Sequence, residues 1–168
     1  KSDDIRPTSD RVREAVFSIL GSRIGPQLEG LYVLDLFAGT GALGFEALSR
    51  GAAHCVFIDT GIEARGLIRG HIEHFGVGGQ TKLLKRDATD LGPAERIRPS
   101  DLVFLDPPYG RGLGERALVS ALSGGWIAPE ALVVLEERKD IAIEAPSGTQ
   151  IIDRREYAET AVTFLDVA

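Results

Sequence analysis

The sequence predicts an α/β fold in which helices cover both faces of a mostly parallel central sheet and an antiparallel strand closes it at the C-terminal end. Short apolar runs alternate with segments of helical periodicity, as in folds that wrap helices around a parallel sheet. Most of these runs are continuous, which is typical of strands buried on both faces. The 168 residues, 43% of them hydrophobic, fit one domain that spans residues 1–168.

The first predicted element is a helix that begins after Thr8-Ser9-Asp10, whose side chains can cap its N-terminus. Apolar residues then recur at helical spacing at Val12, Val16, Phe17 and Leu20. We therefore expect residues 1–30 to form an N-terminal helical extension of the domain.

Five apolar runs are predicted as buried strands, in chain order 31–37, 55–58, 81–84, 102–105 and 132–135. Between them the sequence predicts further helices at 41–50, 63–75 and 112–122. After Pro146-Ser147-Gly148, two short strand-like runs at 150–153 and 161–166 are separated by a charged segment, which predicts a closing antiparallel pair.

The composition limits the classes of function. A formal net charge of -6 argues against binding of nucleic acid by a uniformly basic surface, and it leaves local basic patches open. Cys55 is the only cysteine, and no run approaches the roughly 20 apolar residues that cross a bilayer, so we expect a cytoplasmic protein without a membrane partner. The sequence holds no methionine, even at position 1, so we expect the natural chain to begin before Lys1.

A glycine-rich segment stands where the first predicted strand ends and the next helix begins. Gly39, Gly41 and Gly44 match the pattern G-x-G-x-x-G. In an open parallel sheet, ligands collect beyond the carboxyl ends of the strands, and glycine lets the backbone approach a ligand closely. The pattern alone fits a nicotinamide dinucleotide and S-adenosylmethionine equally well.

Nearby carboxylates favour S-adenosylmethionine. Asp35 precedes the first glycine by four residues, where its carboxylate can accept a hydrogen bond from the methionine ammonium, directly or through water, and would repel a pyrophosphate. Asp59 ends the next strand and can accept the ribose hydroxyls of either nucleotide. Asp87 and Ala88 follow the third strand, where they can flank the adenine ring. Each aspartate also suits a turn or a helix cap.

The segment Asp106-Pro107-Pro108-Tyr109 follows an apolar strand and reaches the same edge of the sheet. The exocyclic amine of a base is a poor nucleophile, because its lone pair is delocalised into the ring. The Asp106 carboxylate and the Pro107 carbonyl can accept its hydrogens as charge develops, and two prolines hold these acceptors rigid. Tyr109 can stack on the base, a contact worth about 1 to 3 kcal/mol. The segment predicts methylation of a base nitrogen, with an ordinary turn as the alternative.

Two segments carry a family resemblance. Asp106 to Tyr109 resembles the motif of amino-methyltransferases that act on adenine, cytosine or guanine amines, and Asp35 to Gly41 resembles their cofactor loop. More narrowly, Arg6-Pro7-Thr8-Ser9-Asp10-Arg11-Val12-Arg13-Glu14 together with 34–52 is similar to the bacterial 16S ribosomal RNA guanine-N2 methyltransferase family. The similarity continues to Gly125-Trp126 and covers nearly the whole chain.

The resemblance implies a Rossmann-like class I methyltransferase fold. It also implies methyl transfer from S-adenosylmethionine to the N2 amine of a guanine in 16S ribosomal RNA, on the assembled or assembling 30S particle. The candidate cofactor contacts are Asp35, Phe37, Ala38, Gly39, Thr40, Gly41, Asp59, Thr60, Asp87 and Ala88. The candidate catalytic residues are Asp106, Pro107, Pro108 and Tyr109, and the candidate RNA contacts are Arg6, Thr8, Arg11 and Arg13.

The chain departs from the family at two of these positions. Many relatives have phenylalanine where this chain has Tyr109, which keeps an aromatic face. Asp59-Thr60-Gly61 lacks the usual pair of acidic residues, so the ribose contact is expected from Asp59 alone. The family's short basic, glycine-containing segment would precede Lys1.

Other polar and aromatic residues are assigned to structure. Glu136 and Glu137 end a predicted strand near the site, and surface charge is the favoured interpretation. Trp126 is expected in the core. His71 and His74 share a helix face without a cysteine or carboxylate at ligand spacing, so we expect no metal.

Three classes of function stay open. A nucleic-acid methyltransferase uses all the motifs, and DNA adenine-N6 or cytosine-N4 methylation uses similar loops. A nicotinamide oxidoreductase would leave residues 106–109 without a role. A catalytically silent RNA-binding assembly factor would bind the particle without transfer. No feature of the sequence indicates an oligomer.

Overall fold

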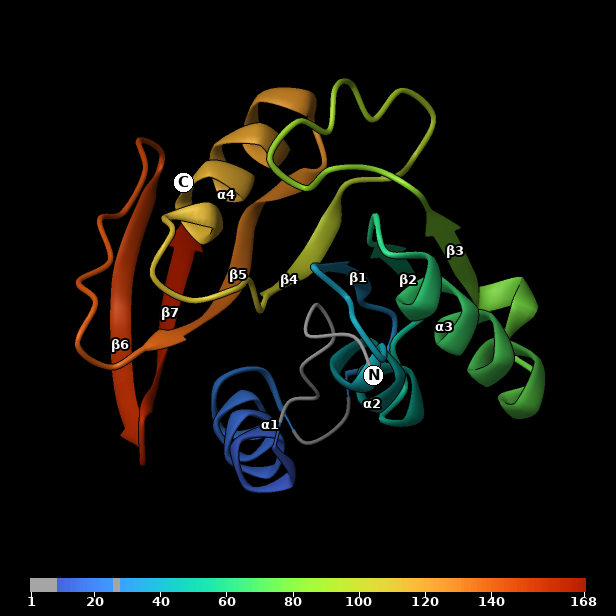
Figure 1. Ribbon diagram of the computed structural model, residues 1–168, viewed down its shortest axis with the longest axis horizontal. Coiled ribbons are helices and arrows are strands. Elements are labelled where there is room, and N and C mark those ends of the chain that lie inside the picture. Colours follow the sequence, from blue (N-terminus) through green and yellow to red (C-terminus); the bar gives the residue numbers. More distant parts are fainter. Residues whose placement is uncertain (1–8, 26–27) are drawn as a thin grey trace.

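A computed structural model describes residues 9–25 and 28–168 (Figure 1). Helix α1 (Asp10–Ile24) begins at Ser9, whose side-chain oxygen accepts a hydrogen bond from the backbone N–H of Val12 at 3.2 Å. Its buried residues are those of the predicted apolar face, Val12, Val16, Phe17 and Leu20. The predicted contacts Arg6 and Thr8 lie outside the described residues.

One mixed sheet forms the centre of the described part of the chain. Its strands are β1 (Tyr32–Leu36), β2 (His54–Ile58), β3 (Thr81–Leu84), β4 (Ser100–Leu105), β5 (Ile127–Arg138), β6 (Thr149–Tyr157) and β7 (Thr160–Val167), in the order β3-β2-β1-β4-β5-β7-β6. Strands β1 to β5 pair in parallel, and β7 runs antiparallel to both β5 and β6. The predicted parallel sheet with an antiparallel closure is confirmed.

Helices cover both faces of this sheet, as predicted. Helices α2 (Ala42–Ser49) and α3 (Ile62–Phe75) pack with α1 on one face, and α4 (Leu113–Gly124) packs on the other (Figure 1). Side chains on β4 alternate between the two cores: Leu102 and Phe104 belong to the first, Val103 and Leu105 to the second. Burial on both faces explains why these strands are continuous apolar runs.

Strand β5 is longer than predicted. The apolar run indicated residues 132–135, whereas the strand extends over Ile127–Arg138. Its last residues are charged, so their sequence gives no strand signal. They pair with β7 instead, Glu136 opposite Val162 and Arg138 opposite Thr160. Tertiary pairing therefore outweighs local propensity here.

The topology fixes where a ligand can bind. Strand β1 lies between β2 and β4, because the chain leaves β1 in one direction through β2 and β3 and returns to build β4 and β5 on the other side. In such sheets the crevice beyond the carboxyl ends of the strands at this reversal is the usual ligand site. The segments after β1 and β4 meet there. None of the helices in the described residues has the length and apolar character needed to cross a membrane.

Candidate active site

A pocket of about 260 Å³ lies at the reversal of strand order. Four segments line it, and each follows or begins a regular element. Phe37 and Gly39 come from the loop after β1, Asp59, Thr60 and Gly61 from the loop after β2, Asp106 and Pro108 from the loop after β4, and Leu113 from the start of α4. The structure thus brings candidate cofactor contacts and candidate catalytic residues to the walls of one pocket.

A smaller pocket of about 60 Å³ adjoins these residues and shares Phe37, Asp59 and Thr60 with the first. Asp87 and Ala88, the predicted neighbours of the adenine ring, line it together with Arg86. Asp87 accepts hydrogen bonds from the side chain and backbone of Thr89 at 2.7 and 2.9 Å, and these bonds lower the pKa of its carboxyl. The turn role considered for Asp87 is therefore present, and its position beside the pocket is compatible with a base contact.

The glycine loop has an unusual backbone that keeps it close to the pocket. Phe37 has a φ of 58°, a left-handed conformation that is costly for a bulky residue. Gly39 (φ 60°) and Gly41 (φ 79°) adopt the same region without a side-chain penalty. The Gly41 N–H donates to the Ala38 carbonyl at 2.8 Å, so this loop turns tightly into α2.

Asp59 joins the loops after β1 and β2. One carboxylate oxygen accepts the Gly39 N–H at 2.9 Å, and the other accepts the Gly61 N–H at 2.8 Å. Each carboxylate oxygen has a second lone-pair direction, so both bonds leave acceptor capacity for a ligand hydroxyl. Asp59 therefore fixes the glycine loop and faces the pocket, and the ribose contact stays a prediction.

Asp35 lies beneath the glycine loop. Its side chain is buried, and its carboxylate accepts the Gly44 N–H at 3.1 Å, which attaches the first turn of α2 to β1. Burial raises the pKa of this carboxyl well above its ordinary value; the Gly44 hydrogen bond opposes the shift, and the charges of Asp106 and Asp59 add to it. The ammonium contact stays a prediction, and the hydrogen bond from Gly44 gives Asp35 a structural role in holding the loop.

The pH dependence of unfolding should report Asp35. Because its pKa is higher in the folded protein, the folded state keeps a proton that the unfolded chain loses near pH 3.8. Its contribution to stability is complete below that pH and is lost as the pH rises toward the folded pKa, by up to about 1.4 kcal/mol per pH unit. Asp35→Asn keeps an acceptor for Gly44 and removes the titration. In urea unfolding between pH 4 and 7, the variant should gain stability relative to the parent, and parallel profiles would contradict this.

The loop after β4 is held at its far end by two buried glutamates. The Tyr109 hydroxyl donates to Glu136 at 2.7 Å and lies 3.0 Å from the Thr160 hydroxyl oxygen. Burial, opposed by the Thr160 bond and reinforced by Glu136, raises the pKa of Tyr109 to about 12. Tyr109 is therefore neutral and tethered to β5 and β7. Of the four candidate catalytic residues, Asp106 and Pro108 line the pocket, and Pro107 and Tyr109 do not. Glu137 accepts the Gly110 N–H at 3.1 Å and the Arg138 N–H at 2.7 Å.

The interpretation of Glu136 and Glu137 as surface charges is wrong. Their exposed fractions are 9% and 2%, because β7 covers this end of β5 and the loop after β4 folds over it. Buried carboxylates are rare unless hydrogen-bonded, and both of these accept bonds from the candidate catalytic loop. The only signal in the sequence was their position after a strand that ends at the ligand edge.

The remaining candidates lie apart from the pocket. Arg11 is exposed on α1, and Arg13 forms ion pairs with Asp10 at 3.0 Å and Glu46 at 3.5 Å. Arg13 and Thr40 line a separate groove of about 500 Å³ between α1, α2 and α3, behind the glycine loop. Trp126 is buried as predicted.

Known proteins align with this chain over most of its length. Residues 1–166 match the family described as Conserved hypothetical protein 95. The chain is 33% identical over 159 residues to Ribosomal RNA small subunit methyltransferase D of Escherichia coli (strain K12), covering 94% of this chain and 76% of that protein. It is 31% identical over 156 residues to the protein of the same name from Haemophilus influenzae, covering 92% and 79%.

Solved structures of other proteins share the fold of this chain. The Escherichia coli protein yhhF superposes with a TM-score of 0.82 at 29% identity, over 99% of this chain and 89% of that one. A magnesium protoporphyrin IX methyltransferase from Synechocystis, solved with bound S-adenosylmethionine, shares the fold at a TM-score of 0.69 and 16% identity, over 94% of this chain and 79% of that one. The fold is thus the Rossmann-like methyltransferase fold. The chain belongs to the Conserved hypothetical protein 95 family, and the two curated relatives described above are each named as a small-subunit ribosomal RNA methyltransferase.

Proposed function

We propose that this protein transfers a methyl group from S-adenosylmethionine to the exocyclic N2 amine of a guanine in 16S ribosomal RNA, on assembled or assembling 30S particles in the cytoplasm. We also propose that residues 1–168 form one cofactor-binding domain, with 1–30 as its helical extension. The observation that carries it is the shared pocket, which Asp106 and Pro108 line together with Gly39 and Asp59. A nicotinamide dinucleotide site would use the glycine loop, and the loop after β4 would then have no role in the reaction.

The residues present suit S-adenosylmethionine. The loop at Gly39 presents backbone without a side chain, and a Cβ placed there would meet only the Phe37 carbonyl oxygen, at 3.9 Å. Asp59 offers acceptor lone pairs for ribose hydroxyls, and Asp87 and Ala88 offer a polar edge and a small side chain beside an adenine. When bound, the cofactor would supply an electrophilic methyl group on its sulfonium.

The protein's own part in the reaction is to hold the amine and accept its hydrogens. Asp106 stands at the pocket wall, and the following Pro107 and Pro108 fix the backbone so that the acceptors do not reorganise during transfer. Glu136 and Glu137 fix the other end of the same loop through Tyr109 and Gly110. A rigid loop of this kind aligns the amine with the methyl group, and alignment supplies a large share of the rate.

The test is transfer of labelled methyl from S-adenosylmethionine to undermethylated 30S subunits, followed by nucleoside analysis. Protein-free 16S ribosomal RNA and duplex DNA serve as parallel substrates. We expect N2-methylguanosine in the RNA of the 30S subunits. Recovery of N6-methyladenine or N4-methylcytosine in the DNA would support the DNA methyltransferase instead, and saturable binding to the particle without transfer would support an assembly factor.

A further inference from the structure

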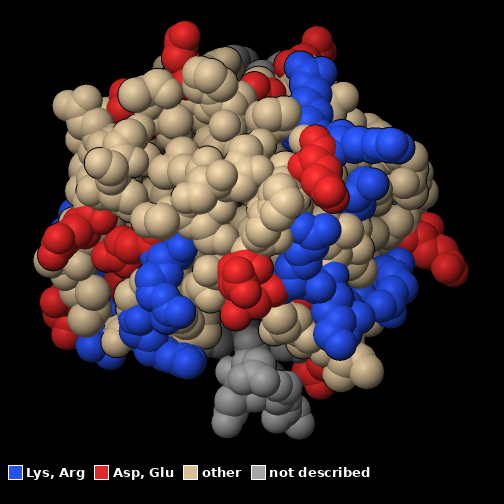
Figure 2. All heavy atoms as spheres, turned by 90° about the horizontal axis from the view of Figure 1, so that it is seen from above, with Lys and Arg blue, Asp and Glu red and all other residues tan. Residues whose placement is uncertain are grey.

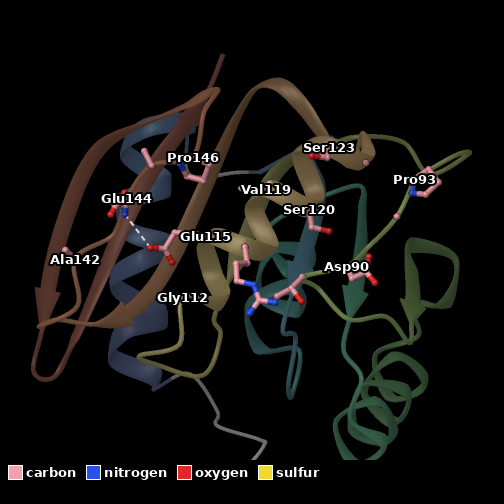
Figure 3. Close-up of a pocket in the computed structure, with 15 residues that line it drawn as sticks. Asp90, Pro93, Gly112, Glu115, Val119, Ser120, Ser123, Ala142, Glu144 and Pro146 are labelled. Atoms are coloured by element: carbon pink, nitrogen blue, oxygen red, sulfur yellow. Dashed lines mark hydrogen bonds between the residues drawn. The ribbon is translucent and has the colours of Figure 1, made fainter.

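A second surface feature lies over the outer face of α4. It is a groove of about 980 Å³ that runs between the connection at 89–93 and the connection at 142–146 (Figure 3). Gly112, three residues after Tyr109, lines the groove, and the next residue, Leu113, lines the catalytic pocket. A molecule bound along α4 would therefore lie next to the site described above.

The walls of this α4 groove are fixed by hydrogen bonds. On one side, the Leu91 N–H donates to the Ser120 hydroxyl at 2.8 Å, and the Gly92 carbonyl accepts a bond from the Trp126 indole at 2.8 Å. On the other side, the Glu144 N–H donates to Glu115 at 3.4 Å, the bond drawn in Figure 3. The wall at 91–92 is therefore already held in place, and binding against it would cost little ordering of that segment.

The charged side chains that line the α4 groove favour a positively charged ligand. Asp90, Glu115 and Glu144 contribute three carboxylates against the single guanidinium of Arg116, which leaves the lining with a net charge of -2. Such a surface repels phosphate and attracts ammonium and guanidinium groups. Figure 2, which is seen from above in relation to Figure 1, shows a broad uncharged area with Lys and Arg side chains at its lower left and on its right, and Asp and Glu side chains among them.

The uncharged part of the lining favours a polypeptide over a nucleic acid. Sites for single-stranded nucleic acid usually combine a positively charged groove with aromatic side chains that stack on the bases, whereas the described lining of this groove holds one arginine and no aromatic residue. It offers small and aliphatic contacts instead, with Val119 49% exposed on α4 and Pro93, Ala142 and Pro146 on the two walls. These surfaces fit the backbone and short side chains of an extended peptide whose basic side chains reach the carboxylates.

From this combination we infer that the α4 groove binds an extended, basic polypeptide segment of a partner protein, with Lys or Arg residues spaced by small ones. The inference goes beyond methyl transfer and does not depend on it. If the substrate is a particle of RNA and basic proteins, such a segment would hold the particle beside the catalytic pocket while the acidic groove excludes phosphate from α4.

The experiment is a fluorescence anisotropy titration with a labelled 12-residue peptide of alternating Lys and Ala, and with a labelled 12-nucleotide oligouridylate. The groove variant combines Glu115→Gln and Glu144→Gln. The matched control combines Glu14→Gln and Glu73→Gln, two exposed helical glutamates outside the groove, so both variants change the net charge equally. We expect the groove variant to weaken peptide binding by about fivefold and the control to change it by less than twofold.

A third variant, Val119→Lys, places a positive charge and added bulk in the middle of the groove at a position that the fold leaves exposed. It should weaken peptide binding further, with an unchanged circular dichroism spectrum. If the groove variant and the control variant weakened peptide binding equally, the inference would be overturned, because binding would then depend only on the net charge of the protein. Competition by the oligouridylate for the groove would also overturn it, as would self-association that the groove variant abolishes. Peptide binding is read without methyl transfer, so a failed transfer assay leaves this result interpretable.

Discussion

Replacing Asp106 with alanine is expected to lower kcat for methyl transfer by about 100- to 1000-fold, the loss typical of removing one positioned electrostatic group from a transition state. Asp106 lines the pocket and belongs to the segment that we propose presents an acceptor to the amine. The binding of S-adenosylmethionine should change little, because the predicted cofactor contacts come from the loops after β1, β2 and β3. Isothermal titration with the cofactor and single-turnover transfer to 30S subunits measure the two effects separately.

A matched control keeps this result specific. Glu73→Ala removes an exposed carboxylate from α3 that is not part of the pocket lining, and it should leave kcat unchanged. If Asp106→Ala transferred methyl at the parental rate, the loop after β4 would not be catalytic. If Asp106→Ala lowered both the affinity for S-adenosylmethionine and the rate of transfer, the Asp106 side chain would act in cofactor binding. The loop after β4 would then contribute to the cofactor site as well as to the reaction.

The fold could be predicted because its core follows local rules. The apolar run at 102–105 is buried on both faces, so every residue in it had to be apolar. Ser9 and the spacing from Val12 to Leu20 define α1 in the same local manner. The position of the pocket then follows from the order of strands, since the loops after β1 and β4 meet wherever the sheet reverses.

The parts that could not be predicted depend on distant partners. Glu136 and Glu137 look like surface residues because their burial requires β7, which pairs with them from positions 161 and 162. Asp35 could be placed at the sheet edge, but the direction of its carboxylate toward Gly44 depends on how α2 packs. The α4 groove likewise joins segments around residues 90, 116 and 144, and no local pattern relates them.

A substitution in the first turn of α2 should lower both the free energy of unfolding and the affinity for S-adenosylmethionine. A Cβ added at Gly44 would lie 2.7 Å from the Cys55 sulfur and still closer to the Phe57 ring, both fully buried on β2. Neither neighbour can move without disturbing the core, so Gly44→Ala should lower the free energy of unfolding by about 1 to 3 kcal/mol, the usual cost of overpacking. The glycine loop should shift with the helix, and affinity for S-adenosylmethionine should fall.

A glycine-to-alanine substitution in the next helix, α3, should change the free energy of unfolding in the opposite direction. Gly66 is exposed in the interior of α3, and nothing lies within 4 Å of a Cβ placed there. Gly66→Ala should therefore raise the free energy of unfolding by about 0.5 to 1 kcal/mol, because alanine loses less backbone entropy in a helix. Urea unfolding and cofactor titration of the two variants form one experiment. If Gly44→Ala matched Gly66→Ala in stability, α2 would not be seated on β2 as closely as described, and the loop it anchors could not hold the pocket in place.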